Sequence, residues 1–285
     1  MIDQLQAIAS RLWGPTSWWH PGGMAWQWAA EQAPGVMRTW DDAAWGWMYQ
    51  PDVLLLQVDP TTPELAAEVV AWFDAANAGT APRVEVAEDQ GHVVTALRDA
   101  GYAEVDEAFG LDLRCAAEQM KARLPRGYAL CTADDVTDDV RINAHRDAWL
   151  PRALPYAPDL RPFIADDATS GFDREKLERT RATPPYTADR DFVITARDGA
   201  PAACCTVWFD AATGSAEIEP LGVSPAHRRR GLAQALCHAA LDAVARAGGV
   251  EVVIHPRGDA AYPAPRGAYS AAGFRAVSRT RIYGR

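Results

Sequence analysis

The stretch that decides the fold reads AEIEPLGVSPAHRRRGLAQALCHAAL and covers residues 216–241. Residues 217–223 have the branched, partly alternating pattern of a strand, which Ser224 and Pro225 interrupt. Apolar residues then recur at helical spacing from Leu232 onward. The stretch therefore predicts a strand, a turn and a helix in direct succession.

The turn between this strand and helix combines arginines with small residues. Arg228, Arg229 and Arg230 precede Gly231, and Ala233 follows it. The first N–H groups of a helix lack intrahelical partners, and the helix dipole makes that end positive. Gly231 and Ala233 leave the backbone open to a bulky group, so the turn is predicted to bind an anion, most naturally a phosphate. The alternative is an ordinary basic helix start, although three arginines there oppose the dipole.

This stretch resembles the acyl-CoA loop of the GNAT acyltransferase superfamily. The signature of that loop is Arg or Gln, two residues, Gly, one residue, then Gly or Ala, preceded by V-x-P. The resemblance implies that acetyl-CoA is the co-substrate and that backbone groups of residues 221–223 bind its pantetheine amides. The predicted donor-site residues are Leu221, Gly222, Val223, Arg228, Arg229, Arg230, Gly231, Leu232 and Ala233.

Charge and tryptophan are distributed unevenly along the chain. The formal net charge of -10 argues against a nucleic-acid partner. Residues 1–115 hold 5 Arg and no Lys against 17 Asp and Glu, whereas residues 116–285 hold 23 basic and 21 acidic residues. Nine of the 11 tryptophans also lie in the first part. This contrast predicts two domains, 1–115 and 126–285, joined by a linker over 116–125.

No targeting, membrane or metal signal stands out in the sequence. The first residues lack a basic segment followed by an apolar run, and no apolar run is long enough to span a bilayer. We therefore expect a cytoplasmic protein without a membrane partner. The five cysteines show no C-x-x-C spacing, so we expect reduced thiols and no metal site.

The resemblance to GNAT domains extends in order over residues 126–285. Strands are predicted over 128–132, 191–196, 202–209, 217–223, 251–255, 274–277 and 280–283. Helices are predicted over 135–150 and 173–181, from 232 onward, and in the segment that ends at 273. The Pro-rich connection after residue 150 corresponds to the segment that borders the acceptor site in this family.

Residues 1–115 repeat this architecture in a weaker form. Strands are predicted over 53–58, 83–86 and 109–113, and helices over 63–76 and 92–100. ALRDAGY at 96–102 looks like AYSAAGF at 268–274. Where the phosphate loop would stand, the chain reads DPTTP, and its aspartate would repel a diphosphate. The predicted fold is therefore α/β (α+β), with two GNAT-like domains, each a mixed, mostly antiparallel twisted sheet flanked by helices; the first repeat is degenerate and binds no CoA.

The first 50 residues are unusually rich in tryptophan, with turn signals at 14–15 and 21–23. We expect a small sheet whose aromatic face packs on the body of the protein. The alternative is an aromatic wall that binds a ligand.

Direct acyl transfer to an amine requires a base for the amine and an acid for the leaving thiolate. Tyr269 stands where the family has its general-acid tyrosine, and the alternative is a core tyrosine on a helix. Glu217 and Glu219 lie two apart on one strand face and are the candidate bases. His255, at the end of the next strand, is a third candidate. The sequence leaves the choice among these three open.

The acidic first domain and the strand carboxylates favour a basic acceptor. We therefore predict an N-acetyltransferase for a small basic amine, with an aminoglycoside or other amino-sugar antibiotic as the concrete candidate and resistance as its role. The alternatives are a peptide or protein amine as acceptor, or a non-catalytic module that senses acyl-CoA. The predicted acceptor-side residues are Trp149, Tyr156, Asp159, Trp208 and Asp210.

Overall fold

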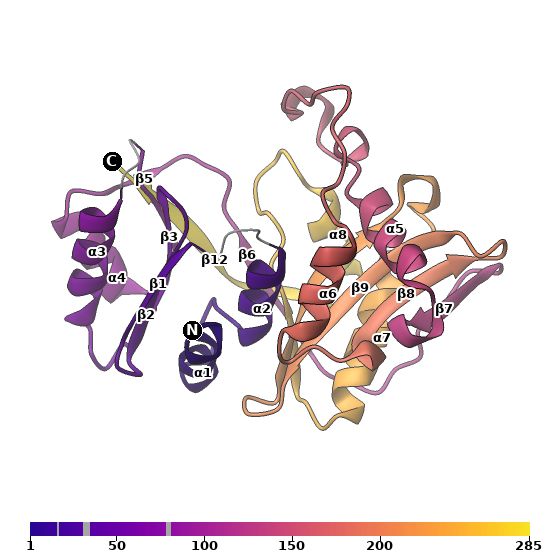
Figure 1. The fold of residues 1–285 in the computed structure, drawn as a ribbon, viewed down its shortest axis with the longest axis horizontal. Helices are drawn as coiled ribbons and strands as arrows, with labels where there is room; N and C mark the ends of the chain where they lie inside the picture. Colours follow the sequence, from indigo (N-terminus) through magenta and orange to yellow (C-terminus); the bar gives the residue numbers. More distant parts are fainter. Residues whose placement is uncertain (16, 31–34, 78–80) are drawn as a thin grey trace.

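The computed structural model describes residues 1–15, 17–30, 35–77 and 81–285. Its described strands form one continuous twelve-stranded sheet that runs through both halves of the molecule (Figure 1). The strand order is β1-β2-β3-β4-β12-β6-β11-β10-β9-β8-β7, and β5 pairs with β12 outside this path. The mixed, mostly antiparallel sheet with helices on its faces confirms the predicted fold class.

The first half starts with two helices, α1 (Ile2–Arg11) and α2 (Pro21–Ala30). The elements that follow are β1 (Val36–Trp40), β2 (Ala44–Gln50), β3 (Val53–Val58), α3 (Leu65–Ala76), β4 (Arg83–Ala87), α4 (Gly91–Asp99) and β5 (Ala103–Val105). Apolar side chains alternate along β3, so one face of this sheet packs on α3 and α4 and the other on α1 and α2.

The prediction of a small sheet over residues 1–50 is wrong for residues 2–11 and 21–30, which are helical. The segment 21–23, predicted as a turn, is the first turn of α2. A Cβ at Gly22 would lie 2.3 Å from the Cβ of Trp208, and one at Gly23 would lie 2.5 Å from Oε2 of Glu217. The two glycines are therefore required because α2 packs directly on the sheet of the second half, and not because the chain turns there.

The second half contains the elements predicted for it, with small shifts at their ends. They are β6 (Leu111–Ala116), β7 (Tyr128–Thr132), α5 (Asp138–Ala148), α6 (Arg174–Ala182), β8 (Asp191–Ala196), β9 (Pro201–Asp210), β10 (Ser215–Val223), α7 (Leu232–Arg246), β11 (Glu251–Ile254), α8 (Ala264–Ala271) and β12 (Arg275–Gly284). Helix α5 covers one face of the sheet, and α7 and α8 cover the other. Helix α2 of the first half lies on the face of α5, against β9, β10 and α6 (Figure 1).

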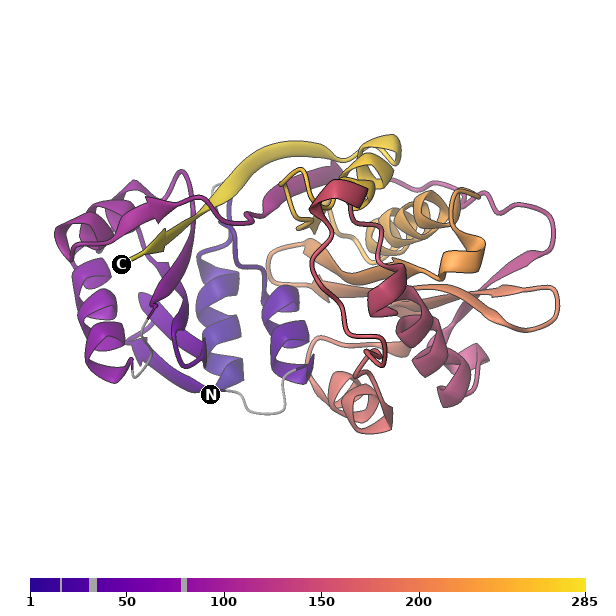
Figure 2. The same ribbon diagram turned by 90° about the horizontal axis from the view of Figure 1, so that it is seen from above.

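Two strands connect the halves. β12 pairs with β6 through its first residues and with β4 and β5 through its last, so the C-terminus lies in the sheet of the first half (Figure 2). The strands predicted separately over 274–277 and 280–283 are therefore one strand. β6, predicted as the end of the first domain, pairs with β11 and β12. The predicted domain boundaries at 115 and 126 stay a prediction. The sheet itself continues from one half to the other.

The first half has a carboxylate where the second half has its arginine loop. Asp59 Oδ1 accepts hydrogen bonds from Thr61 N at 2.9 Å and Thr61 Oγ1 at 2.7 Å, and Oδ2 binds Arg11 at 2.9 Å. These hydrogen bonds lower the pKa of Asp59. An anion of the chain itself thus holds the donors before α3, which supports the prediction that this repeat binds no CoA.

Within the described residues, no helix has the length and apolar character needed to cross a membrane.

Candidate active site

The connection from β10 to α7 is an open cradle of backbone N–H groups. Gly231 is the N-cap of α7 at φ 79°, and Arg229 before it also has a positive φ of 59°. In the described structure, the N–H groups of residues 229–234 make no backbone hydrogen bond, whereas Ala235 N already bonds Gly231 O at 3.0 Å. Nothing lies within 4 Å of a Cβ built on Gly231. Successive free N–H groups of this kind form an anion-binding nest at a helix start.

The strand before this cradle, β10, separates from β11 after Glu217. β10 pairs with β11 only over Ser215–Glu217, but with β9 as far as Val223. A register shift between Ile218 and Leu221 marks the point of separation. The backbone groups of residues 221–223 on the β11 side are therefore free of strand pairing in the described structure. They can pair with an extended, amide-bearing ligand in the way that an added strand does.

A cavity of about 550 Å³ joins the separated strand, the cradle and α8. Eight of the nine predicted donor-site residues line it, and Arg230 does not. Trp149, predicted on the acceptor side, also lines this cavity, and its ring lies so close to Gly222 that a Cβ there would be 2.2 Å away. The predicted donor residues are thus brought together around one cavity of the size of a ligand site.

Arg228 has a different place from the other arginines of the loop. Its Nε donates to Val223 O at 3.1 Å, and its Nη atoms donate to the carbonyl oxygens of Ala148 and Ala153. The guanidinium therefore fixes the end of α5 against the end of β10. Arg230 contacts Ala226 O at 3.4 Å, and Arg229 lines the cavity.

Tyr269 lies on α8 at the floor of the donor cavity and is 7% exposed. Burial, together with nearby ionisable groups that include Glu219, raises its pKa well above 10. The phenol therefore keeps its proton at neutral pH, as an acid for a leaving thiolate must.

A second cavity of about 340 Å³ lies between the two halves of the molecule. Three carboxylates and an imidazole line it, together with four aromatic side chains and Arg257. The residues are Trp18, Trp19, Gly23, Trp26, Gln27, Glu85, Ala108, Phe109, Gly110, Glu217, Glu219, His255 and Arg257. We refer to it as the acidic cavity. Glu219 lines it, whereas Leu221, two residues further along β10, lines the donor cavity.

Glu219 has the properties of a base for an amine. Burial and then the charge of Glu217 raise the pKa of Glu219 from 4.5 to about 8. A carboxylate with such a pKa accepts a proton near neutral pH far more readily than an ordinary glutamate. The carbonyl group of Glu219 accepts a hydrogen bond from Trp208 Nε1, which fixes the backbone beside the carboxylate.

His255 is a cation in this site and not a base. Its Nδ1 lies 3.0 Å from Glu217 Oε1, and its Nε2 lies 3.7 Å from Asp112 Oδ1. Burial alone would lower the pKa of His255, but these two carboxylates outweigh burial and raise it to about 10. His255 therefore holds its proton and orients Glu217. Of the three candidate bases, the geometry favours Glu219.

None of the five predicted acceptor residues lines the acidic cavity. Trp208 and Asp210 lie opposite Glu217 and Ser215 on β9, but α2 and α1 of the first half cover them. Trp208 is fully buried, and Asp210 accepts a hydrogen bond from Ser10 Oγ at 2.6 Å. Tyr156 packs on Tyr262, outside the acidic cavity. Asp159 lies in a short exposed 3-10 turn, also outside it. Trp149 lines the donor cavity.

Sequence reasoning missed that Glu85 and Trp18 line the acidic cavity. It also missed that Asp112 lies beside His255. Trp18, Trp19 and Trp26 line the cavity, whereas Trp45 and Trp47 are fully buried in the core of the first half. Trp45 and Trp47 pack in the core, as the first interpretation of the Trp-rich segment expects, and ligand binding by Trp18, Trp19 and Trp26 stays a prediction. The tryptophan density was the only sequence signal for this wall.

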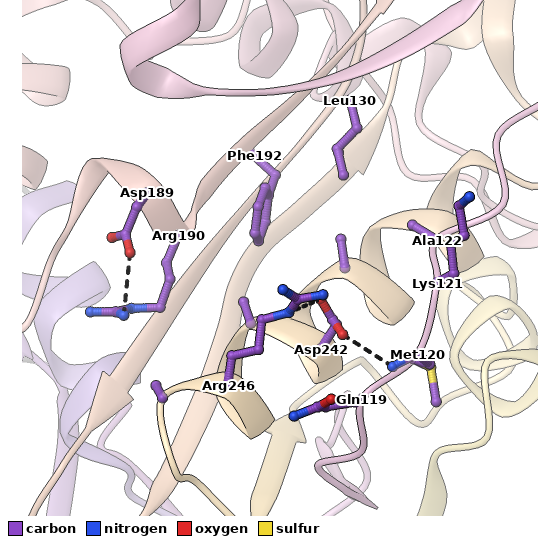
Figure 3. A pocket seen from close by; sticks show the side chains of 13 residues that line it. Gln119, Met120, Lys121, Ala122, Leu130, Asp189, Arg190, Phe192, Asp242 and Arg246 are labelled. Carbon is purple, nitrogen blue, oxygen red and sulfur yellow. Dashed lines mark hydrogen bonds and ion pairs between the residues drawn. The ribbon is translucent and has the colours of Figure 1, made fainter.

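A third cavity, of about 900 Å³, lies elsewhere, between α7, β7, β8 and the segment around residue 120 (Figure 3). Four of its charged side chains are paired: Arg190 with Asp189 at 3.5 Å, and Arg246 with Asp242 at 2.7 Å. No predicted site residue lines it. Among the described residues, no group of three or more His, Cys, Asp or Glu is arranged to hold a metal ion.

Comparison with known proteins agrees with the fold and the loop. Residues 157–274 match the model of the acetyltransferase (GNAT) family. The chain therefore carries an acetyltransferase domain of the GNAT type, the domain of acyl-CoA-dependent transferases. No curated protein matches the sequence.

Solved structures with the same fold include tandem GNAT proteins. A tandem GNAT protein from the clavulanic acid biosynthesis pathway has a TM-score of 0.61 and 16% identity, with 100% of this chain and 93% of that chain covered. A GNAT acetyltransferase from Colwellia psychrerythraea has a TM-score of 0.61 and 13% identity, with 100% of this chain and 97% of that chain covered. A GCN5-related N-acetyltransferase from Sphaerobacter thermophilus has a TM-score of 0.59 and 18% identity, with 85% of this chain and 76% of that chain covered. The full coverage shows that the first half is GNAT-like in fold as well.

Proposed function

We propose that the protein transfers an acetyl group from acetyl-CoA directly to a primary amine of a small basic molecule. The observation that carries this proposal is the arrangement of two cavities around β10. Leu221 lines the cavity with the phosphate cradle, and Glu219 lines the acidic cavity. A thioester bound along residues 221–223 would therefore end beside the carboxylate that meets the amine.

The residues present fit the parts that the reaction requires. The free N–H groups of residues 229–234 would bind the diphosphate of acetyl-CoA, and the unpaired edge of β10 would bind its pantetheine. Glu219 would take the proton of the incoming ammonium group, and the amine nitrogen would then attack the thioester carbonyl. As the C–S bond breaks, the thiolate would take the proton of Tyr269, and the second proton that the nitrogen loses on becoming an amide would return to the Tyr269 phenolate.

The acidic cavity supports a cationic acceptor. Its carboxylates attract an ammonium group, and the faces of Trp18 and Trp26 attract cations through their ring quadrupoles. Its volume of about 340 Å³ accommodates one sugar ring or a short aliphatic chain. We therefore propose an amino sugar or an aliphatic amine as the acceptor, and retain the aminoglycoside and its role in antibiotic resistance as the most specific form of this proposal. Acetyl-CoA is a cytoplasmic metabolite, so the proposal places the protein in the cytoplasm.

The test is a thiol-release assay with acetyl-CoA and a panel of aliphatic amines, amino sugars, aminoglycosides and basic peptides. We expect turnover with small amines. Turnover with peptides alone would assign the protein to peptide or protein acetylation. Acetyl-CoA binding by calorimetry without turnover on any amine would show an acyl-CoA-sensing module and would overturn the proposed activity.

A further inference from the structure

The acidic cavity is lined by carboxylates from both halves of the molecule. Glu217 and Glu219 lie on β10 of the second half, and Glu85 lies on β4 of the first. Strands β12, β6 and β11 separate β4 from β10 in the sheet. One cavity is therefore lined by carboxylates from two strands, β4 and β10, that belong to different halves of the molecule.

Glu85 is held in place by a hydrogen bond and not by an ion pair. Thr280 Oγ1 donates a hydrogen bond to Glu85 Oε1 at 2.7 Å, and the N–H of Gly110 donates to Thr280 Oγ1 at 2.7 Å. Within the described part of the chain, no basic side chain forms an ion pair with Glu85, and burial raises its pKa although the charge of His255 acts in the opposite direction. Arg257 lines the same cavity, but its guanidinium is bound to Asp259. An oriented carboxylate without an ion pair is suited to bind a cationic group of a ligand.

Glu217, on the second half, has one carboxylate oxygen without a hydrogen bond. The side chain is 4% exposed, and its Oε1 is held by His255. Its Oε2 is buried, lies 3.9 Å from Nδ1 of His20 and has no hydrogen-bond partner among the described residues. Buried polar atoms are almost always paired in native proteins, so this oxygen is suited to accept a donor from a bound molecule. Trp18 and Trp26 line the same cavity.

We propose that the acceptor carries a second cationic nitrogen that binds Glu85 while the first nitrogen is acetylated beside Glu219. This inference rests on the proposed function and narrows its acceptor to a dication: an aliphatic diamine or polyamine, or an amino sugar with two amino groups. The nitrogen at Glu85 keeps its proton. The nitrogen at Glu219 gives one proton to that carboxylate and attacks the thioester carbonyl. As the C–S bond breaks, Tyr269 protonates the departing thiolate, and the second proton that the nitrogen loses on becoming an amide returns to the Tyr269 phenolate. Glu219 then releases its proton to solvent.

The test compares α,ω-diamines with monoamines of equal chain length in the thiol-release assay. We expect kcat/KM to be at least about tenfold higher for the diamine of optimal length, because only it makes the second ion pair. Glu85→Gln should remove this preference by raising KM of the diamine about tenfold, a far larger change than in KM of the monoamine, because the diamine alone has a nitrogen bound at Glu85. Glu88→Gln is the matched control, since Glu88 follows β4, binds Arg279 and Arg281, and does not line the cavity.

The outcomes separate this inference from the activity itself. Monoamine turnover by Glu85→Gln at the wild-type rate shows that the variant is folded. If diamines and monoamines react equally well, or Glu85→Gln changes both to the same extent, the role of Glu85 is refuted while the acetyltransferase activity stands. If neither the wild-type protein nor any variant acetylates an amine, the proposed function fails and the inference with it.

Discussion

Replacing Glu219 by glutamine tests the assignment of the base most directly. The amide has nearly the same shape but cannot take a proton from the amine. A general base typically contributes about 10²- to 10⁴-fold, so kcat should fall by a factor in this range. Because the pKa of Glu219 is raised to about 8, wild-type kcat/KM should increase with pH up to about 8 and then level off. This rise should be absent from the pH profile of the variant.

The same pKa predicts a change in stability. The pKa of a glutamate in the unfolded chain is 4.5, so between 4.5 and about 8 the folded protein binds a proton that the unfolded chain does not. The contribution of Glu219 to the free energy of unfolding is therefore fully present below pH 4.5 and is lost as the pH rises to about 8. The difference corresponds to at most about 5 kcal/mol, an upper bound because the carboxylate is partly open to water in the cavity. Urea unfolding at about pH 5 and about pH 9 should show Glu219→Gln gaining stability relative to wild type at the higher pH.

Two results would refute this reasoning. One is a Glu219→Gln variant with wild-type kcat. The other is a variant that retains the rise of kcat/KM near pH 8, because another group would then be the base. Glu217→Gln is the informative comparison, since Glu217 lines the same cavity but is held by His255. If only this second variant loses the rise, the base is Glu217.

Three further substitutions test other parts of the site. Gly231→Glu should abolish acetyl-CoA binding in calorimetry by placing a carboxylate in the cradle, whereas Gly248→Glu, with the same left-handed φ at the other end of α7, should bind normally. Tyr269→Phe should lower kcat by about 10²-fold or more with little change in acetyl-CoA affinity, and an unaltered kcat would mean that another group protonates the thiolate. Gly23→Ala should destabilise the fold by about 1–3 kcal/mol in thermal unfolding, because the new methyl group would lie 2.5 Å from Glu217 Oε2, and Gly14→Ala, with open space around it, should not.

The donor side could be predicted because its parts are neighbours in the sequence. A strand, a turn and a helix start are encoded within residues 217–233, and Gly231 is required by local backbone geometry. The candidate base is equally local, since Glu217 and Glu219 follow from the alternation of one strand. The choice between them could not be predicted, because it depends on the contact of Glu217 with His255, which is 38 residues away in the chain.

The acceptor side could not be predicted because it depends on how the two halves pack. Trp208 pairs with Glu217 across β9 and β10, but nothing in the sequence indicates that α2 would cover it. The segment 21–23 has the composition of a turn, and only its contact with β9 and β10 explains glycine in the first turn of a helix. The predicted break between the last two strands fails for a similar reason: β12 is continuous because it pairs with β6 as far as Arg279 and with β4 from Thr280 onward.

These differences suggest a division of labour between the two halves. The donor cavity is lined by residues of the second half, which under the proposed function would bind acetyl-CoA. The acidic cavity takes Trp18, Trp26 of α2 and Glu85 of β4 from the first half, which would then contribute to the choice of amine. In the corresponding loop of the first half, Asp59 accepts hydrogen bonds from the backbone and the side chain of Thr61. Substitutions in β4 or α2 can accordingly alter the accepted amine while the donor cavity stays intact.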